Sequence, residues 1–344
     1  MHFLNRIYDG GRQIFICLLL VLVFVCSGCL FAEGGEQDMP EEASDKGVEI
    51  INYNSQGEKV AEVFAAPPRR VVAIWQNNVE TILALGAGDR IVAAVGVPFE
   101  ECLRPEYREA YRKIPVRQME MPGVENILML EPELIAGWAS TFTERVTKTT
   151  EFWQGRGIRT YMPYSSIGRG QVRRIEDEYN YILDFGRIFG REAQAEGLVA
   201  RMRQEIDFVQ SNTRGQPKPR TAILEKQGMQ FLVYGENSLA GDILRHVNGE
   251  LVALGSSASY EQLIEADPEV IFLVVSESMY RYADEIAADM LANPALQGVA
   301  AIRGRRIYVI PLYMVYSSAT RTYDGICRMA GGLYPDLYEG RLPE

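Results

Sequence analysis

The 344-residue sequence predicts two similar α/β lobes that are built on parallel sheets and joined by a single long helix. Three observations predict this fold class. Short apolar strands alternate with helical segments, one helix–turn–strand segment occurs twice, and a long helical pattern lies between the two copies. The length is consistent with two domains that each have a hydrophobic core.

The N-terminus has the features of an export signal. Arginines precede an unbroken apolar run over 14–25, which is the usual length of a signal-peptide core and too short to span a membrane comfortably. The run ends in a C-S-G-C motif at 26–29, and small residues before a cysteine resemble the lipobox of bacterial lipoproteins. We therefore expect a lipoprotein signal peptide over 1–28 and lipidation of Cys29. An ordinary signal peptide or an uncleaved anchor is the alternative.

Residues 29–47 are polar and acidic, and they are expected to form a flexible tether. The whole chain has 46 Asp and Glu against 35 Lys and Arg, for a formal net charge of −11. Nucleic-acid binding needs a basic surface, so this balance excludes nucleic acid as a partner. An acidic protein is also repelled by anionic lipid, so the expected contact with the membrane is the lipid anchor.

The first lobe is expected over 48–171. A hairpin is predicted over 48–63, around Asn54-Ser55-Gln56-Gly57. Strands are predicted over 71–74 and 91–95, with a polar loop over 75–78 and a helix over 79–85 between them. The glycines at 86 and 88 close this helix and precede a strand, which favours a helix C-cap over a phosphate-binding loop.

An internal repeat is the most informative feature of the sequence. Residues 124–135 match residues 260–271, and each copy is predicted to form a short helix, an acidic-Pro-Glu turn and a buried strand. The proline ends the helix because it cannot continue the hydrogen-bond ladder. Paired arginines at 69–70 and at 305–306 precede apolar strands, which we interpret as a second trace of the same duplication.

A helical pattern over 172–190 is expected to be the interdomain helix. A second helical run is predicted from Ala193 to Val209, and the second lobe is assigned to 191–344. A single connecting helix would be stiff, so closure of the two lobes would be limited to small angles.

Segments over 70–74 and 80–92, both repeat copies, 231–249, 293–309 and 321–335 together resemble the periplasmic binding protein family for iron siderophores, haem and vitamin B12. The resemblance covers nearly everything after the tether. It implies two Rossmann-like lobes with the ligand in the cleft between them, and a substrate-binding component of an ABC importer with no resident cofactor. A ferric siderophore is the first choice of ligand. Cobalamin, haem and oxyanions are alternatives.

Glu125 and Glu261 occupy equivalent positions near the start of the repeated helices. In the resembled family, acidic residues at these positions dock onto the two permease subunits, so the resemblance implies permease docking. The alternative is a carboxylate that only stabilises the helix N-terminus. Glu80 and Asp242 are expected to be solvated.

The cleft is expected at the carboxyl ends of the strands, where open α/β sheets bind ligands. Aromatic rings suit large planar chelates, and an arginine suits an anionic oxygen. For each residue, core packing is the competing interpretation, and Arg321 could instead cap a helix or pair with an internal carboxylate. The predicted ligand-binding residues are Trp75, Gln76, Asn77, Trp138, Tyr164, Tyr234, Tyr313, Tyr316 and Arg321, with Ser140, Thr141 and Ser165 as neighbours.

Direct binding of a bare transition metal is not expected, because the only histidines are His2 and His246. An oxygen-only ferric site remains open. Cys102 and Cys327 either form a disulfide or remain two isolated thiols. No G-x-S-x-G motif is present, and the mature chain has no histidine to spare for a Ser/His/Asp set, so we expect a binding protein without catalysis. We also expect it to be a monomer. An enzyme on the same scaffold and a ligand-sensing surface lipoprotein are the alternatives of other classes.

Overall fold

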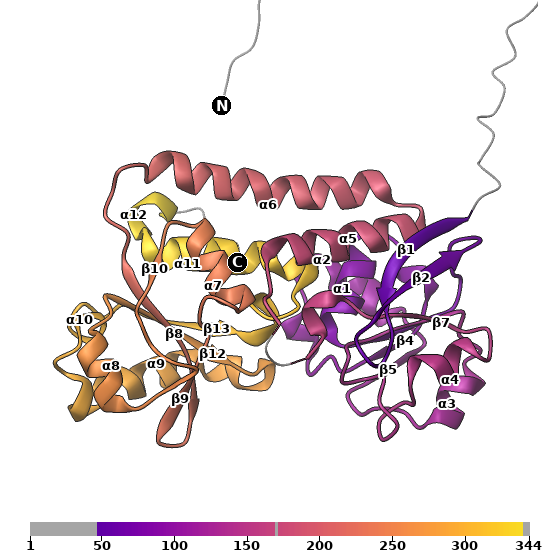
Figure 1. Cartoon of the computed structure of the whole chain (residues 1–344), viewed down its shortest axis with the longest axis horizontal. Helices are drawn as coiled ribbons and strands as arrows, with labels where there is room; N and C mark the ends of the chain where they lie inside the picture. The colour runs from indigo at the N-terminus through magenta and orange to yellow at the C-terminus, as the bar shows by residue number, and fades with distance from the viewer. Residues whose placement is uncertain (1–46, 169–170, 340–344) are drawn as a thin grey trace, which may run out of the picture. The chain divides into compact units, whose positions relative to one another are not determined.

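The computed structural model describes residues 47–168 and 171–339. The body of the chain from Lys46 onward forms one compact unit that contains two separate α/β sheets and a small hairpin sheet (Figure 1). Among the described residues, no helix is long and apolar enough to cross a membrane. The predicted signal peptide, Cys29 and all of the predicted tether except Gly47 lie outside the described residues.

The first lobe contains a five-stranded sheet in the order β5-β4-β3-β6-β7, and all of its neighbouring strands are parallel. The two predicted strands are confirmed, because β3 and β4 cover the predicted residues. The elements of this lobe are β3 (Val71–Ile74), α1 (Gln76–Ala84), β4 (Ile91–Val95), α2 (Pro105–Arg112), β5 (Val116–Gln118), α3 (Val124–Met129), β6 (Leu134–Ala136), α4 (Thr150–Gln154) and β7 (Arg159–Tyr161).

The predicted hairpin is confirmed as β1 (Val48–Tyr53) and β2 (Lys59–Phe64), which pair antiparallel. The side chain of Asn54 accepts hydrogen bonds from two backbone amides in the turn, and Gly57 supplies the positive φ that the turn requires. Asn52 joins this hairpin to the first lobe through hydrogen bonds with Thr160 and Met162.

Helix α1 begins at Gln76, so the prediction of a polar loop over 75–78 was wrong. The side chains of Gln76, Asn77 and Asn78 are buried and hydrogen-bonded to groups outside their own turn. These contacts stabilise a helical turn that the low helix propensity of asparagine disfavours. The helix ends as predicted, with Gly86 at a φ of 71°.

Two antiparallel helices connect the lobes: α5 (Ile175–Phe189) and α6 (Glu192–Asn212), with Gly190 in the left-handed conformation between them. The predicted helix over 172–190 is therefore present as α5. However, Figure 1 shows that the longer helix running above both sheets is α6. Because the two helices pack along each other, the connection is stiffer than one helix alone.

The second lobe has a sheet in the order β11-β9-β8-β12-β13, with β10 also paired to β8. β12 lies parallel to β8 and β13, whereas β9 pairs antiparallel with β8 and β11. Its elements are β8 (Arg220–Gln227), β9 (Gln230–Val233), α7 (Leu239–His246), β10 (Glu250–Leu251), β11 (Ser257–Ala258), α8 (Tyr260–Ala266), β12 (Val270–Val275), α9 (Ala283–Ala292), α10 (Ala300–Arg303), β13 (Ile307–Pro311), α11 (Thr322–Leu333) and α12 (Pro335–Tyr338).

The internal repeat is confirmed at the level of structure. Helix α3 leads through Pro132 into the buried strand β6, and helix α8 leads through Pro268 into the buried strand β12. In each lobe, an arginine donates hydrogen bonds to the last carbonyls of the repeat helix. The arginine is Arg70 in the first lobe and Arg220 in the second.

The structural counterpart of Arg70 is therefore Arg220, and the proposed match with Arg306 was wrong. Arg306 donates instead to the carbonyls of Gly332 and Leu333 at the end of α11. The match failed because the sequence pattern, two arginines before an apolar strand, does not show which position that strand takes in its sheet.

Candidate ligand-binding cleft

An aromatic cavity of about 100 Å³ lies between the two lobes. The first lobe contributes two tryptophans, Trp75 and Trp138, whose rings stack with centroids 5.3 Å apart. The second lobe contributes Tyr313, which is buried. All six loop and helix segments that line it follow the carboxyl end of a strand, which is where open α/β sheets bind ligands. The lining residues are Trp75, Gln76, Asn77, Gly96, Pro98, Met119, Trp138, Glu277, Leu312 and Tyr313.

Three residues that line this cavity have a buried polar atom with no hydrogen-bond partner in the described protein. These atoms are Oε1 of Gln76, Oδ1 of Asn77 and Nε1 of Trp138. An unpaired buried polar atom costs roughly 1–3 kcal/mol, so such atoms are normally matched by water or a ligand. The residues that line the cavity therefore include aromatic rings, one unpaired donor and two unpaired acceptors.

Trp75 is held in an uncommon conformation at the edge of the cavity. Its φ is 76°, and its indole Nε1 donates to Oγ1 of Thr141 over 3.0 Å. A Cβ atom at Gly96 would lie 2.9 Å from the Trp75 ring, so glycine is needed there for this close approach. Backbone strain of this kind is frequent at ligand sites.

A short segment of the second lobe, Ser317–Ala319, is held by the first lobe and by α5. The carbonyl of Ser317 accepts a hydrogen bond from the Asn77 amide, and the Ser317 hydroxyl bonds to Ser165. The amide of Ala319 donates to Glu178 over 2.5 Å. Both Ser317 and Ala319 have positive φ values, so the segment depends on these contacts.

Glu178 is fully buried at this junction. Burial raises its pKa to about 7, although hydrogen bonds from Ala319 and Ser165 work in the opposite direction. Its second carboxyl oxygen, Oε1, has no partner among the described residues. The carboxyl group therefore changes charge near neutral pH at a point where the two lobes meet.

Arg321 is 6 % exposed and pairs with internal carboxylates, which was the alternative interpretation of this residue. Its Nε lies 3.1 Å from Asp324 and 3.6 Å from Glu80 on α1. Burial disfavours the guanidinium charge, but Glu80 and Asp324 raise the pKa of Arg321 above its ordinary value. The expectation that Glu80 is solvated was wrong, because this carboxylate is completely buried and supports the junction of the lobes.

The remaining predicted residues lie at different distances from the aromatic cavity. Tyr316 packs edge-on against Trp138, with ring centroids 5.6 Å apart. Tyr234 is buried and donates its hydroxyl to Glu225. Tyr164 lines a separate pocket beside β1, so the structure does not bring it together with the tryptophans. Thr141 and Ser165 are buried and hydrogen-bonded, whereas Ser140 is exposed.

Sequence reasoning missed several residues of the cavity wall. Pro98 and Met119 from the first lobe, and Glu277 and Leu312 from the second, line the aromatic cavity. Each follows a strand, which is the signal that identified Trp75 and Trp138. Their side chains are not aromatic or cationic, and residue type alone therefore did not single them out.

Glu125 and Glu261 are both exposed in the first turn of the repeat helices α3 and α8. Neither forms a salt bridge within the described residues. The hydroxyl of Ser259, at the start of α8, lowers the pKa of Glu261. The equivalent apolar positions also match, because Ile127 and Leu263 are buried while Leu128 and Ile264 are exposed.

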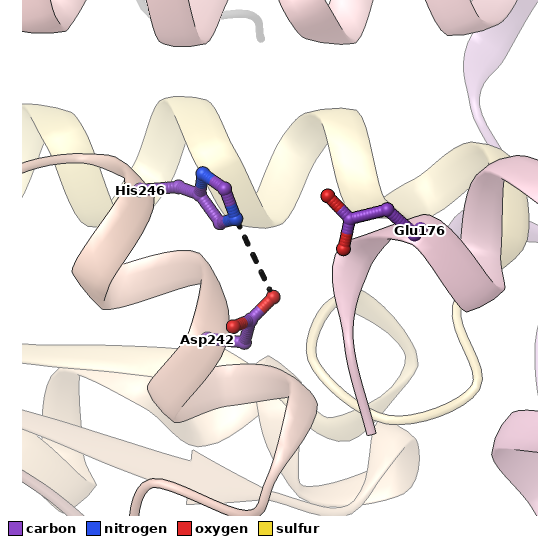
Figure 2. Close-up of side chains that lie close together, drawn as sticks. All are labelled: Glu176, Asp242 and His246. Carbon is purple, nitrogen blue, oxygen red and sulfur yellow. Dashed lines mark ion pairs between the residues drawn. The ribbon is translucent and has the colours of Figure 1, made fainter. Parts of the chain in front are cut away.

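Glu176, Asp242 and His246 lie close together where α5 meets α7 (Figure 2). Asp242 is buried, so the expectation that it is solvated was wrong. Its carboxylate accepts from the Ile175 amide and pairs with Arg245. Burial by itself raises the pKa of Asp242, but hydrogen bonds from His246, Arg245 and Ile175 lower it to about 2. Because these protein groups already neutralise the carboxylate, we interpret the cluster as a structural junction.

Cys102 and Cys327 are both free thiols. Burial raises the pKa of the Cys327 thiol to about 12, which keeps it protonated and unreactive at neutral pH. Of the two arrangements left open by the sequence, the structure contains the pair of isolated thiols.

Comparison with known proteins agrees with this geometry. Residues 71–313 match the family described as periplasmic binding protein. The crystal structure of a periplasmic binding protein from Veillonella parvula is 41% identical, with a TM-score of 0.82, and the match covers 87% of this chain and 95% of that one.

Two curated relatives match at lower identity. The ABC transporter substrate-binding lipoprotein YvrC of Bacillus subtilis is 20% identical, over 93% of this chain and 96% of the relative. The ferric-anguibactin-binding protein FatB of Vibrio anguillarum is 21% identical, over 85% of this chain and 90% of the relative. The two lobes, the cavity between them and these matches show that the chain belongs to the family of periplasmic solute-binding proteins of ABC importers.

Proposed function

We propose that this protein is the lipid-anchored substrate-binding component of an ABC importer and that its cargo is a ferric siderophore. The observation that carries the proposal is the aromatic cavity between the lobes, with its three unpaired polar atoms. Ligand sites in proteins are mostly apolar and contain a few well-placed polar groups. The similarity to a ferric-anguibactin-binding protein supports an iron chelate as cargo.

The cavity itself is smaller than the roughly 300–1,000 Å³ typical of small-molecule sites. We therefore propose that the lobes separate slightly, or that one arm of the chelate occupies the aromatic cavity while the rest lies beside it. The paired helices α5 and α6 restrict this motion to small angles, which favours a ligand that fits a nearly preformed site.

Titration of intrinsic tryptophan fluorescence tests the cargo, because two of the three tryptophans line the cavity. The ligands to compare are ferric siderophores, haem, cobalamin, molybdate and free ferric ion. We expect saturable quenching by a ferric siderophore at nanomolar to micromolar affinity, about −12 to −8 kcal/mol. Trp138→Ala should weaken this binding. If only haem, cobalamin or molybdate binds, that ligand replaces the siderophore as the proposed cargo. If no ligand changes the tryptophan fluorescence, the transport role is contradicted.

Glu125 and Glu261 are proposed to dock the protein onto a two-fold symmetric permease. Their equivalent places on the repeated helices support this role, since one acidic side chain per lobe matches one cationic site per permease subunit. In vesicles that contain the cognate permease, Glu125→Lys and Glu261→Lys should each lower transport by about tenfold or more. Chelate binding should stay unchanged, and Glu265→Lys on the same helix α8 is the matched control.

Loss of chelate binding in these variants, or an equal loss of transport in the control, would contradict the docking role.

The lipid anchor is tested separately. Cys29→Ser should abolish incorporation of labelled fatty acid and release a monomeric protein from the membrane fraction. Continued labelling of this variant would move the lipidation site to another cysteine.

A further inference from the structure

One contact between the lobes is exposed and lies beside the aromatic cavity. The guanidinium carbon of Arg281, in the second lobe, is 3.7 Å from the centroid of the Phe99 ring in the first lobe. Phe99 is 38 % exposed, and Arg281 is also exposed. A cation placed over an aromatic face is attracted by the ring, and the attraction is weak when both groups are in contact with water.

Phe99 belongs to a first-lobe segment over 96–103 that borders two spaces between the lobes. Pro98 lines the aromatic cavity, whereas Cys102 and Leu103 line a second interlobe pocket of about 540 Å³. Phe99 therefore lies at the point where this segment passes from one space to the other.

The second lobe has a corresponding segment, the short 3₁₀ helix Glu277–Tyr282. Glu277 lines the aromatic cavity and Tyr280 lines the larger pocket, so this helix also runs from one space to the other. The contact between Arg281 and Phe99 therefore joins the two segments that border both spaces.

The ends of the first-lobe segment are fixed by other parts of the same lobe. The amide of Gly96 donates to the carbonyl of Gln118, and the side chain of Gln76 donates to the carbonyl of Cys102. Phe99 lies between these two anchors. An exposed side chain changes rotamer within nanoseconds, so the Phe99 ring can leave the guanidinium without movement of the sheet.

Other contacts between the lobes are largely buried. Arg104 of the first lobe binds Asp324 of the second at 2.6 Å. Arg321 pairs with Glu80 on α1. Leaving one partner of a buried ion pair without the other is far more costly than losing an exposed cation–π contact. The buried network therefore keeps the lobes joined while the exposed contact opens and closes.

We propose that Phe99 and Arg281 form a clasp that divides the space between the lobes and that must open for the ligand to enter the aromatic cavity. This inference rests on the proposed function, because it concerns how a chelate reaches a cavity of about 100 Å³. Opening the clasp joins this cavity to the pocket of about 540 Å³, which is within the size range of small-molecule sites. Movement of two exposed side chains is enough, so the stiff pair α5 and α6 need not bend.

The first measurement needs no ligand, because it follows the access of acrylamide to the tryptophans of the ligand-free protein. Trp75 and Trp138 line the aromatic cavity, whereas Trp153 is fully buried. Phe99→Leu and Arg281→Gln should each raise the constant for collisional quenching by about twofold or more, since each removes the contact that closes the cavity. The double variant should match the single variants, because both changes remove the same contact.

Two controls separate the clasp from general effects of charge and packing. Arg281→Lys keeps a cation over the ring and should leave quenching close to that of the wild type. Arg203→Gln removes another exposed guanidinium, whose carbon lies 5.0 Å from the ring centroid of Tyr179 on α5, outside both spaces. This change should leave quenching unaltered.

The second measurement is stopped-flow binding of a ferric trihydroxamate, followed by tryptophan fluorescence. A gate changes the barrier in both directions, so Phe99→Leu and Arg281→Gln should raise the association and dissociation rate constants together by about twofold to fivefold. The dissociation constant should change by less than about twofold. A rise in the dissociation rate constant alone would show that these residues only contact the ligand, which would overturn the clasp.

Acrylamide quenching that is the same in wild type, Phe99→Leu and Arg281→Gln would overturn the inference and leave the proposed function intact. An equal increase of quenching in Arg203→Gln would also overturn the inference. If quenching rises as expected but no ligand of the wider panel changes the tryptophan fluorescence, the proposed function fails while the clasp stands.

Discussion

The two lobes share a frame but differ at the edge that lines the aromatic cavity. In both, a repeat helix leads through a proline into a buried strand, and an arginine holds the last carbonyls of that helix. A glutamate after the proline accepts a backbone amide: Glu133 from Arg69 and Glu269 from Arg220. The repeated part therefore holds the strands together where they begin, and it places the equivalent residues Glu125 and Glu261 in the exposed first turn of each repeat helix.

At the edge that lines the cavity, the two lobes supply different side chains. The first lobe presents the stacked pair Trp75 and Trp138 to the aromatic cavity, whereas the second presents Tyr313, Leu312 and Glu277. The second sheet also contains the antiparallel strand β9, which has no counterpart in the all-parallel first sheet. The difference teaches that the duplicated frame carries the fold, while the loops after the strands give each lobe its own side chains at the cavity.

The largest effect is expected where the lobes are tied together by the buried pair of Arg321 and Glu80. Arg321→Ala should destabilise the protein by about 3–5 kcal/mol, because it leaves an uncompensated buried carboxylate. The measurement is denaturant unfolding. Combining Arg321→Met with Glu80→Gln should cost less than the two single changes added together. Additive effects would show that the pair does not tie the lobes.

A smaller effect is expected at Glu178, where the connecting helix α5 meets the second lobe. The raised pKa means that the folded protein holds this proton more tightly than the unfolded chain between about pH 4.5 and 7. Wild-type stability should therefore fall as pH rises through this window, by up to about 3 kcal/mol.

Glu178→Gln should remove this pH dependence, because the amide keeps an acceptor for the Ala319 amide and has no charge to bury. Thermal unfolding at a series of pH values between about 4 and 8 provides the measurement. If wild type and variant have parallel stability profiles across this range, Glu178 does not titrate in the folded protein near neutrality.

The smallest effect tests the equivalence of the two lobes directly. Arg70→Ala and Arg220→Ala should each cost about 1–2 kcal/mol of unfolding free energy, because each removes hydrogen bonds from a charged donor to helix-end carbonyls. The two costs should agree and should add in the double variant. Arg145→Ala is the exposed control. If only one of the two substitutions lowers the free energy of unfolding strongly, the two arginines are not equivalent and the lobes do not share the same frame.

Much of the frame could be predicted from the sequence because its signals are local. The strands over 71–74 and 91–95 are short apolar runs, and proline ends each repeat helix wherever the rest of the chain lies. The first turn of α1 could not be predicted. Asn77 is stabilised there by Ser317, which is 240 residues away in sequence. Local propensity therefore gave the wrong element.

The candidate site was only partly predictable for the same reason. Trp75, Trp138 and Tyr313 were found because aromatic residues after strands point to a ligand edge, and the structure brings them to one cavity. Tyr164 carried the same signal but lies elsewhere, since the hairpin β1–β2 covers it. Met119 and Glu277 line the cavity but carried no signal, because neither side chain is aromatic or cationic.

The sequence alone determined the two α/β lobes, the repeated helix–turn–strand segments and the exposed positions of Glu125 and Glu261. Hydrophobic periodicity and proline act over a few residues, so these features do not depend on the partner lobe. Only the tertiary structure decided which charges are buried and which side chains meet between the lobes. Glu80 and Arg321 lie at opposite ends of the folded chain, and their pairing exists only once the two lobes are packed together.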